Sequence, residues 1–253
     1  MAQGNGATWE KDMSNYTDQT KNNTFGKLNI TIEDLYSIAI FHKNLVDDEA
    51  FNLVGEVLMS MAEDFAIAEG TSFWTGNGKG EMSGILNAPA VGAGQLTGFD
   101  EVERVPTAAS TTIKIEDIYE LTGALKVGYQ SDAQFRCNRK TITLLRKLRS
   151  DSGAGAGTGT FLWQPSVQAG VPATLDGYPI SQAQELTATP EAASAQSIVF
   201  GSFRRGYKVT DRMGIEVLRD NLTAYPSIAY KAHKRVGGGV SKGEALKILQ
   251  VTP

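Results

Sequence analysis

The chain has 253 residues, which is enough for one or two domains, and a chain of this length buries about three quarters of its unfolded surface when it folds. Hydrophobic residues make up 41% and charged residues 21%, which excludes wholesale disorder, a coiled coil and collagen. One cysteine excludes an internal disulfide, and together with two histidines it is too few for a four-ligand zinc site. The net charge of −4 lacks the basic surplus that tight binding to a nucleic-acid backbone requires.

The N-terminal sequence and the hydropathy pattern indicate whether the protein is secreted or inserted into a membrane. Residues 1–23 are polar and contain no apolar core of a signal peptide. No run approaches the roughly 18 apolar residues of a membrane-spanning helix. We therefore expect neither classical secretion nor a membrane partner.

Residues 1–45 are rich in Asn, Thr and Lys and predict two extended runs around a polar turn. The second run, 28–32, alternates apolar and polar residues as a half-buried strand does. A two-stranded ribbon with little to bury is marginal in isolation. We expect it either to lie on another subunit or to stay mobile.

A long helix is predicted over residues 47–69, because Phe51, Val54, Leu58 and Phe65 recur at helical spacing. An acidic segment opens it and Gly70 closes it. At 1.5 Å per residue the helix would measure roughly 33 Å, long enough to run the length of a domain.

Three alternate glycines follow this helix, between Gly76 and Gly84. They invite comparison with a phosphate-binding loop, but neither phosphate-loop pattern is satisfied and the segment follows a helix instead of a strand. We interpret the glycines as positive-φ turn residues that reverse the chain. Residues 88–112 read as a loop of small and polar residues.

The remaining chain mixes helices and strands. Helices are predicted over 115–128 and 139–149, and a glycine-rich loop over 150–160. The predicted strands cover 134–138, 178–182, 197–201, 207–210, 215–218, 227–236 and 245–251. This order of elements predicts an α+β fold in which 131–212 could be an inserted domain.

Charges are sorted along the chain. Residues 46–70 contain seven acids and no Lys or Arg, whereas 133–149 contain six bases and no acid. Two interpretations stay open at this point. The blocks are either solvated helix faces or complementary patches on neighbouring copies of one protein.

No catalytic constellation emerges, and we expect no catalytic residue, cofactor or metal. His42 and His233 have no acidic residue within two positions, so neither forms an obvious base and orienting pair. Cys137 lies in a predicted strand, where a buried, inert thiol is the usual outcome.

Several segments in order resemble the major capsid (coat) proteins of tailed bacteriophages and the related gene-transfer-agent capsids. The segments are Trp9-Glu10-Lys11, LVDDEA at 45–50, EDFAIAEG at 63–70, FWTGNG at 73–78, SGIL at 83–86, LDGYPI at 175–180, VFGSF at 199–203, RGY at 205–207, VLRDN at 217–221 and KRVGG at 234–238. Each segment alone is weak, but their order spans nearly the whole chain.

The resemblance implies the Hong Kong 97-type capsid fold, with a long spine helix, a peripheral β-sheet, an axial domain and an extended β-hairpin loop. It places the extended loop at 1–45, the peripheral domain with its spine helix at 46–130, the axial domain at 131–212 and returning peripheral strands at 213–253. The family's N-terminal arm has no counterpart in this sequence, so we expect a processed or truncated chain.

The resemblance also implies residues that contact other subunits. Candidates are Trp9, Lys27, Arg139, Lys140, Arg146 and Asn221. Some relatives weld a loop Lys to an Asn of the peripheral domain, assisted by a Glu, and Lys27 and Asn221 match those two motifs. Residues 222–236 contain no acid, however, so the assisting Glu has no obvious counterpart.

The implied function is a structural protein that self-assembles into hexameric and pentameric capsomers and an icosahedral shell around double-stranded DNA. Its other partners would be a portal and scaffolding, protease or decoration proteins, and it would reside in the virion after assembly in the bacterial cytoplasm. One alternative is an encapsulin-like nanocompartment. The other is an enzyme that holds a phosphate ligand in the segment from Gly76 to Gly84.

Overall fold

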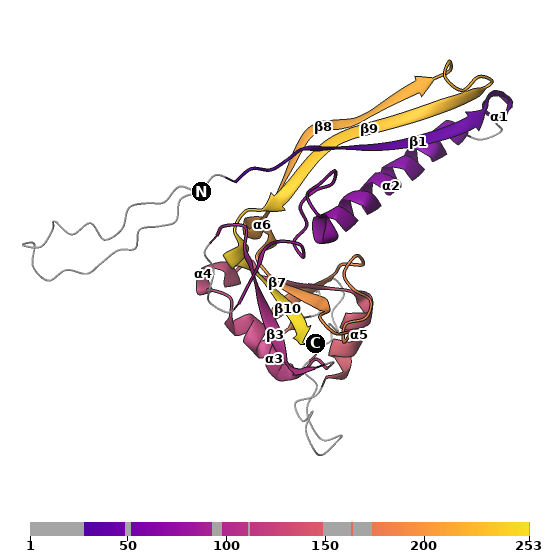
Figure 1. Ribbon diagram of the computed structural model, residues 1–253. Helices are drawn as coiled ribbons and strands as arrows, with labels where there is room; N and C mark the ends of the chain where they lie inside the picture. Colours follow the sequence, from indigo (N-terminus) through magenta and orange to yellow (C-terminus); the bar gives the residue numbers. More distant parts are fainter. Residues whose placement is uncertain are drawn as a thin grey trace, which may run out of the picture.

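The structure is a computed structural model that describes residues 28–48, 52–92, 98–110, 112–148, 163 and 174–252. It divides into an elongated arm and a body at one end of that arm (Figure 1). The arm holds a three-stranded sheet and the long helix α2, while the body holds a seven-stranded sheet and shorter helices.

The arm sheet has the order β1-β9-β8, and all its pairings are antiparallel. Its strands are β1 (Glu33–His42), β8 (Tyr207–Asp220) and β9 (Ser227–Val240), and the short α1 (Lys43–Asp47) follows β1. Helix α2 (Leu53–Thr75) lies along one face of this sheet (Figure 1). Met61 and Phe65 of α2 are buried in one cluster with Ile228, Tyr230 and Ala232 of β9, because both elements turn an apolar face toward each other.

The body sheet has the order β2-β3-β10-β7-β4-β6-β5. Its strands are β2 (Ala90–Val91), β3 (Val102–Ser110), β4 (Gln134–Cys137), β5 (Thr174–Leu175), β6 (Tyr178–Gln182), β7 (Gln196–Gly201) and β10 (Leu246–Thr252). The body's helices are α3 (Ile115–Gly123), α4 (Val127–Gln130), α5 (Arg139–Lys147), α6 (Phe203–Gly206) and the 3-10 turn η2 (Gly243–Ala245). The rings of Phe135 and Phe200 lie 4.4 Å apart at the centre of its core.

The long helix begins and ends about six residues later than the sequence predicts. Asn52 caps it, because its side chain accepts a hydrogen bond from the Gly55 amide at 3.1 Å. Gly70 lies inside the helix, which continues to Thr75 because Phe73 and Trp74 still find aromatic partners in Tyr207 and Phe203. The spine helix predicted at 47–69 is therefore confirmed as an element and corrected in its bounds.

Three predictions about strands are also corrected. Residues 28–32 form no strand, and the half-buried alternation begins at Glu33 instead. The predicted loop at 88–112 contains β2 and β3, because β3 finds a parallel partner in β10. The strands predicted at 207–210 and 215–218 are one strand, β8, whose pairing register shifts between Asp211 and Glu216.

The last strand departs from the predicted sheet membership. Residues 213–253 were expected to return together to the sheet of the long helix, and β8 and β9 do lie there. Strand β10 instead lies between β3 and β7 in the body. Its first four residues are all buried, so it needs the two-sided cover of a central strand.

Candidate assembly surfaces

The structure places four of the six predicted contact residues, and all four lie on the surface. Asn221 is exposed in the turn between β8 and β9, at the far end of the arm (Figure 1). Arg139, Lys140 and Arg146 are exposed on α5 in the body, and the guanidinium of Arg146 lies 4.9 Å from the ring centre of Trp163. Trp9 and Lys27 lie outside the described residues. The structure therefore does not bring Asn221 and the α5 bases together.

One face of the arm sheet carries apolar side chains that nothing in the described chain covers. We call Tyr36, Ile38 and Ile40 of β1 and Leu218 of β8 the outer sheet face. Their exposed fractions are 72%, 51%, 58% and 63%. Ile38 and Leu218 both pair with Lys231 of β9, which places them on one side of the sheet. The alternate residues of β1 face α2, so α2 cannot cover this side.

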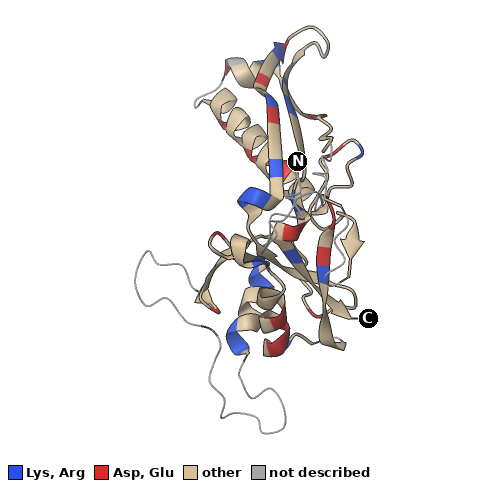
Figure 2. Cartoon of the chain, turned by 90° about the vertical axis from the view of Figure 1, so that its left-hand side faces the viewer, with Lys and Arg blue, Asp and Glu red and all other residues tan. Residues whose placement is uncertain are grey.

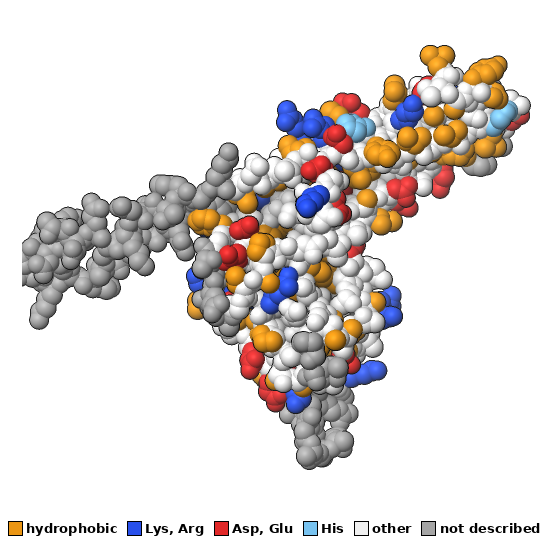
Figure 3. All heavy atoms as spheres, in the orientation of Figure 1, with side chains coloured by type: hydrophobic (Ala, Val, Ile, Leu, Met, Phe, Trp, Pro, Cys, Tyr) orange, Lys and Arg blue, Asp and Glu red, His pale blue; other side chains and the backbone are white. Residues whose placement is uncertain are grey.

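Figure 3 shows hydrophobic side chains gathered along the arm. Single exposed apolar residues are normal on protein surfaces, but a contiguous row is typical of a contact site. Tyr36, Ile38 and Ile40 form such a row along β1, and Leu218 lies on the same side of the sheet, across Lys231 of β9.

Ion pairs lie on the same side of the sheet, beside these apolar residues. Lys231 Nζ lies 2.6 Å from Asp220, and Arg235 Nε lies 2.7 Å from Asp34. The hydrogen bond from Lys231, followed by those from Thr223 and two backbone amides, holds the pKa of the Asp220 carboxyl well below its ordinary value. Asp220 is thus anionic at neutral pH and joins β8, β9 and the turn between them.

The tip of the arm is a second exposed apolar surface. Leu222 and Tyr225 of the β8–β9 turn are 90% and 83% exposed. Leu45 of α1 is 55% exposed. The Lys43 amide donates to the Pro226 carbonyl at 3.1 Å, which ties the start of α1 to the same turn.

Four of the seven acids of the acidic block lie on α2, and one of them, Glu69, is neutralised within the chain. Glu69 accepts a hydrogen bond from Lys234 Nζ at 2.6 Å. Burial of Lys234 opposes its charge, but the contact with Glu69 outweighs this and raises the pKa of Lys234. Within the described part of the chain, Glu56, Glu63 and Asp64 are exposed and have no ion pair.

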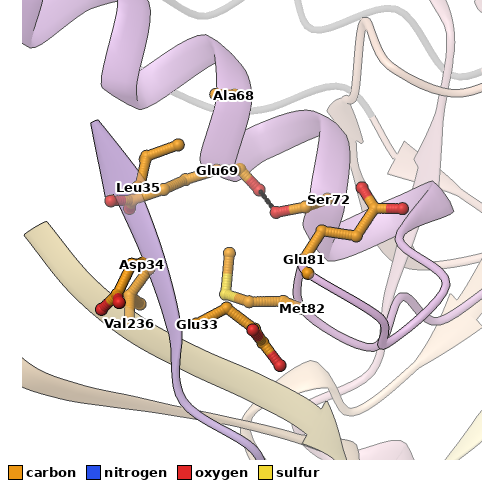
Figure 4. A pocket seen from close by; sticks show the side chains of 10 residues that line it. Glu33, Asp34, Leu35, Ala68, Glu69, Ser72, Glu81, Met82 and Val236 are labelled. Carbon is orange, nitrogen blue, oxygen red and sulfur yellow. Dashed lines mark hydrogen bonds between the residues drawn. The ribbon is translucent and has the colours of Figure 1, made fainter. Parts of the chain in front are cut away.

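A small hollow of about 140 Å³ lies between β1, α2 and the glycine turn. Figure 4 shows carboxylates of Glu33, Asp34 and Glu81 around it, with Leu35 and Met82 among its apolar lining. Asp34 already pairs with Arg235, and Glu81 accepts from the Asn77 amide at 3.1 Å. The described residues contain no group of three or more His, Cys, Asp or Glu side chains that could hold a metal ion.

The glycine segment is the turn that the sequence predicts. Gly78 and Gly80 have φ values of 74° and 72°, which favour glycine. The segment's own side chains occupy its amides, since Asn77 accepts from the Lys79 amide at 2.7 Å. Tyr207 donates its hydroxyl to the Ser83 carbonyl at 2.8 Å and docks the turn on the arm. These contacts use the groups that a phosphate loop would offer to a ligand.

The histidines and the cysteine have structural contacts. His42 caps α1, because its Nδ1 accepts from the Asn44 amide at 3.3 Å. His233 Nε2 lies 3.6 Å from Asp34 on the arm. Cys137 is fully buried, and burial raises the pKa of its thiol to about 12. A thiol with that pKa is protonated at neutral pH, and Cys137 is buried as the sequence predicts.

None of the described helices has the length and apolar character needed to cross a membrane.

The sequence profile of the phage capsid family matches residues 1–251. Two solved capsids, of an empty and of a native GTA particle, are each 30% identical to this chain. They superpose with TM-scores of 0.82 and 0.85, over 98% of this chain and 81% and 82% of theirs. No curated protein matches this chain.

More distant solved structures share the fold alone. A protein of Gordonia phage Cozz is 12% identical, with a TM-score of 0.63 over 100% of this chain and 80% of its own. A chain of the holo-SrpI encapsulin complex from Synechococcus elongatus PCC 7942 is 15% identical, with a TM-score of 0.59 over 87% of this chain and 73% of its own.

Proposed function

This chain belongs to the phage capsid family, and we propose that it is a major capsid protein that self-assembles into capsomers and an icosahedral shell enclosing double-stranded DNA. The family and the fold are those of structural proteins found in the virion. Portal, scaffolding, protease and decoration proteins are further proposed partners, and the host cytoplasm is the proposed place of assembly.

The observation that carries this proposal is the outer sheet face. A chain that folds as a solitary monomer has no reason to align Tyr36, Ile38, Ile40 and Leu218 on one exposed side of a sheet. A shell subunit does, because burying such a row between copies supplies the main favourable term of association. We propose that another copy of the chain covers this face.

The two structural regions suggest how the predicted domains map onto the fold. We propose that the arm is the peripheral domain and that the body is the axial domain. The extended loop predicted over 1–45 then ends before β1, because Glu33–His42 pairs with β9 in the arm sheet. The body includes β3 and β10 besides the segment 131–206, because residues 207–212 belong to β8 in the arm. A closed shell requires one chain to form several different contacts, and an arm and a body with separate surfaces suit that requirement.

Negative-stain microscopy of the expressed chain tests the proposal directly. We expect closed particles from the wild-type chain and none from the double variant Ile38→Asp/Ile40→Asp, which places two charges in the proposed contact. Val127→Asp is the matched control, because Val127 is 81% exposed but lies on α4, away from the outer sheet face. A wild-type chain that stays a compact monomer at high concentration would refute the proposal, as would particles formed equally well by the double variant.

An encapsulin-like compartment is the second candidate, favoured by the shared fold with the encapsulin chain. Particle contents distinguish the two functions. Nuclease-protected double-stranded DNA inside particles from infected or induced cells supports a capsid. A single packaged protein and no DNA would support the compartment.

A further inference from the structure

A basic hollow of about 520 Å³ lies where the arm meets the body. Its lining comes from three segments that are distant in sequence: Lys126, Gly128, Tyr129, Arg204, Arg205, Lys208, Lys242 and Glu244. Figure 2 turns the side of the molecule that bears α4 and α6 in Figure 1 toward the viewer, and basic segments lie around the junction of the two sheets. No local sequence pattern marks this set, because no two of its segments are close along the chain.

The single carboxylate that lines the hollow, Glu244, already accepts hydrogen bonds from two side chains. Glu244 accepts a hydrogen bond from Lys126 Nζ at 2.6 Å and another from the Tyr129 hydroxyl. Burial disfavours its charge, but these hydrogen bonds outweigh burial and lower the pKa of Glu244. The charge of Lys242 also lowers the pKa of Glu244, without a hydrogen bond, so this one carboxylate faces two lysines.

A second cation, Arg205, is held in place by the fold. Its Nη1 donates to the Gly128 carbonyl at 3.0 Å, and its Nη2 lies 3.8 Å from Asp132. Its guanidinium also lies 5.7 Å from the ring centre of Tyr129. Arg205 is thus oriented before any ligand arrives.

Five cations line the hollow and face one lining carboxylate, Glu244. Across the part of the chain that the structure describes, Arg204, Lys208 and Lys242 form no hydrogen bond or ion pair through their side chains. Like charges that share one concave surface repel each other, and a neighbouring anion removes that cost. General basicity does not explain the cluster, because the whole chain has a net charge of −4.

We infer that this hollow binds phosphate-type oxyanions, either the phosphodiester groups of nucleic acid or a free polyphosphate. Arginine offers a fork of donors that matches phosphate oxygens, and lysine adds compact point charges. The volume exceeds what one phosphate group fills, so the ligand carries several. The inference is independent of the proposed function, because binding is measured on the chain whether or not it forms particles.

Calorimetric titration of the full-length chain with sodium tripolyphosphate at low salt tests the site. We expect Lys208→Gln/Lys242→Gln to weaken binding by at least about tenfold. Arg139→Gln/Lys140→Gln removes the same charge from α5 and should stay within about twofold of wild type. Unchanged circular dichroism melting of both variants shows that folding is intact. The inference is wrong if tripolyphosphate does not bind, or if both variants weaken it equally.

A duplex of about 20 base pairs, titrated at several salt concentrations, identifies the source of the phosphate. If the bound groups belong to nucleic acid, the duplex binds and the Lys208→Gln/Lys242→Gln variant lowers the salt-dependence slope by about one per lost cation. If only tripolyphosphate binds, the ligand is a free polyphosphate. If neither probe binds and the same variant fails to assemble, the hollow receives carboxylates of another copy and the inference is overturned.

Discussion

The arm and the body of this protein bury their apolar residues in different ways. In the body, both faces of the sheet are covered, and side chains such as Phe135, Phe200 and Leu249 have no exposed surface. In the arm, one helix covers one face of a three-stranded sheet, and no described residue covers the outer sheet face. The body can therefore be stable within one chain, whereas we propose that contact with another copy completes the arm.

Aromatic contacts at the junction fix these two regions to each other. Phe73 of α2 meets Tyr207 edge to face at 5.9 Å, and Trp74 meets Phe203 at 5.8 Å. Tyr207 begins β8, so the helix, the arm sheet and the body share one packed corner. In the proposed shell, a fixed angle between arm and body would let each copy impose the same geometry on its neighbours.

The largest expected effect is the loss of a central body side chain. Phe200→Ala should lower the free energy of unfolding by about 3–5 kcal/mol, because it leaves a cavity beside Phe135 and Tyr178. Urea unfolding of the unassembled chain measures this. A loss below about 1 kcal/mol would show that the body core is not as tightly packed as the contrast with the arm requires.

A buried ion pair gives the next test of the body. Lys247 of β10 donates to Glu103 of β3, and the two side chains are 3% and 7% exposed. Lys247→Met should destabilise the chain by about 3 kcal/mol or more, because it leaves a buried carboxylate without that partner. Lys247→Met/Glu103→Leu removes both charges and should recover most of the loss. If the double variant is as unstable as the single one, packing and not charge is responsible.

In the arm, truncation of an apolar side chain should lower particle yield and leave the stability of the unassembled chain nearly unchanged. Ile38→Ala should change the free energy of unfolding of the unassembled chain by no more than about 0.5 kcal/mol, because Ile38 is 51% exposed. The yield of particles should nevertheless fall, since the outer sheet face is the proposed contact. Urea unfolding and particle yield are measured on the same preparation. A stability loss as large as that of Phe200→Ala would mean that the arm face is already covered within the chain.

The sequence predicts most helices and strands, but it predicts few of the strand pairings. Apolar periodicity is a local property, so it finds α2 and the strands β6, β7 and β9. It misses β3, because Pro106 and the small residues that follow it read as a loop. The place of β3 is decided by pairing with β10, about 140 residues away, and no local pattern carries that information.

The candidate surfaces differ in whether a local sequence pattern marks them. Residues 35–41 are apolar or small throughout, which is a local signal in the sequence that both faces of β1 are to be covered. The basic hollow could not be predicted, since its cations come from segments that only the sheet order brings together. The predicted contact residues Asn221, Arg139, Lys140 and Arg146 are exposed, and their contacts with other copies stay predictions.

The smallest expected effect concerns the charge that holds the arm tip. Lys231→Met should raise the pKa of Asp220, because the hydrogen bond from Lys231 is the largest cause of its depression. Arg219→Met is the matched control, since Arg219 pairs with Tyr230 and points to the other side of the sheet. NMR titration of the Asp220 carboxyl measures both variants.

The direction of the pH dependence follows from the depressed pKa. Asp220 releases its proton more readily when folded than when unfolded, so its contribution to stability is present above the unfolded value of about 3.9. The contribution is lost as the pH falls through the lower folded value. Lys231→Met should therefore move loss of tip structure toward higher pH, while unfolding of the body at neutral pH stays unchanged. Equal shifts from Arg219→Met would show that net charge and not this hydrogen bond sets the pKa, and the tip would then be held by Thr223 and the turn amides alone.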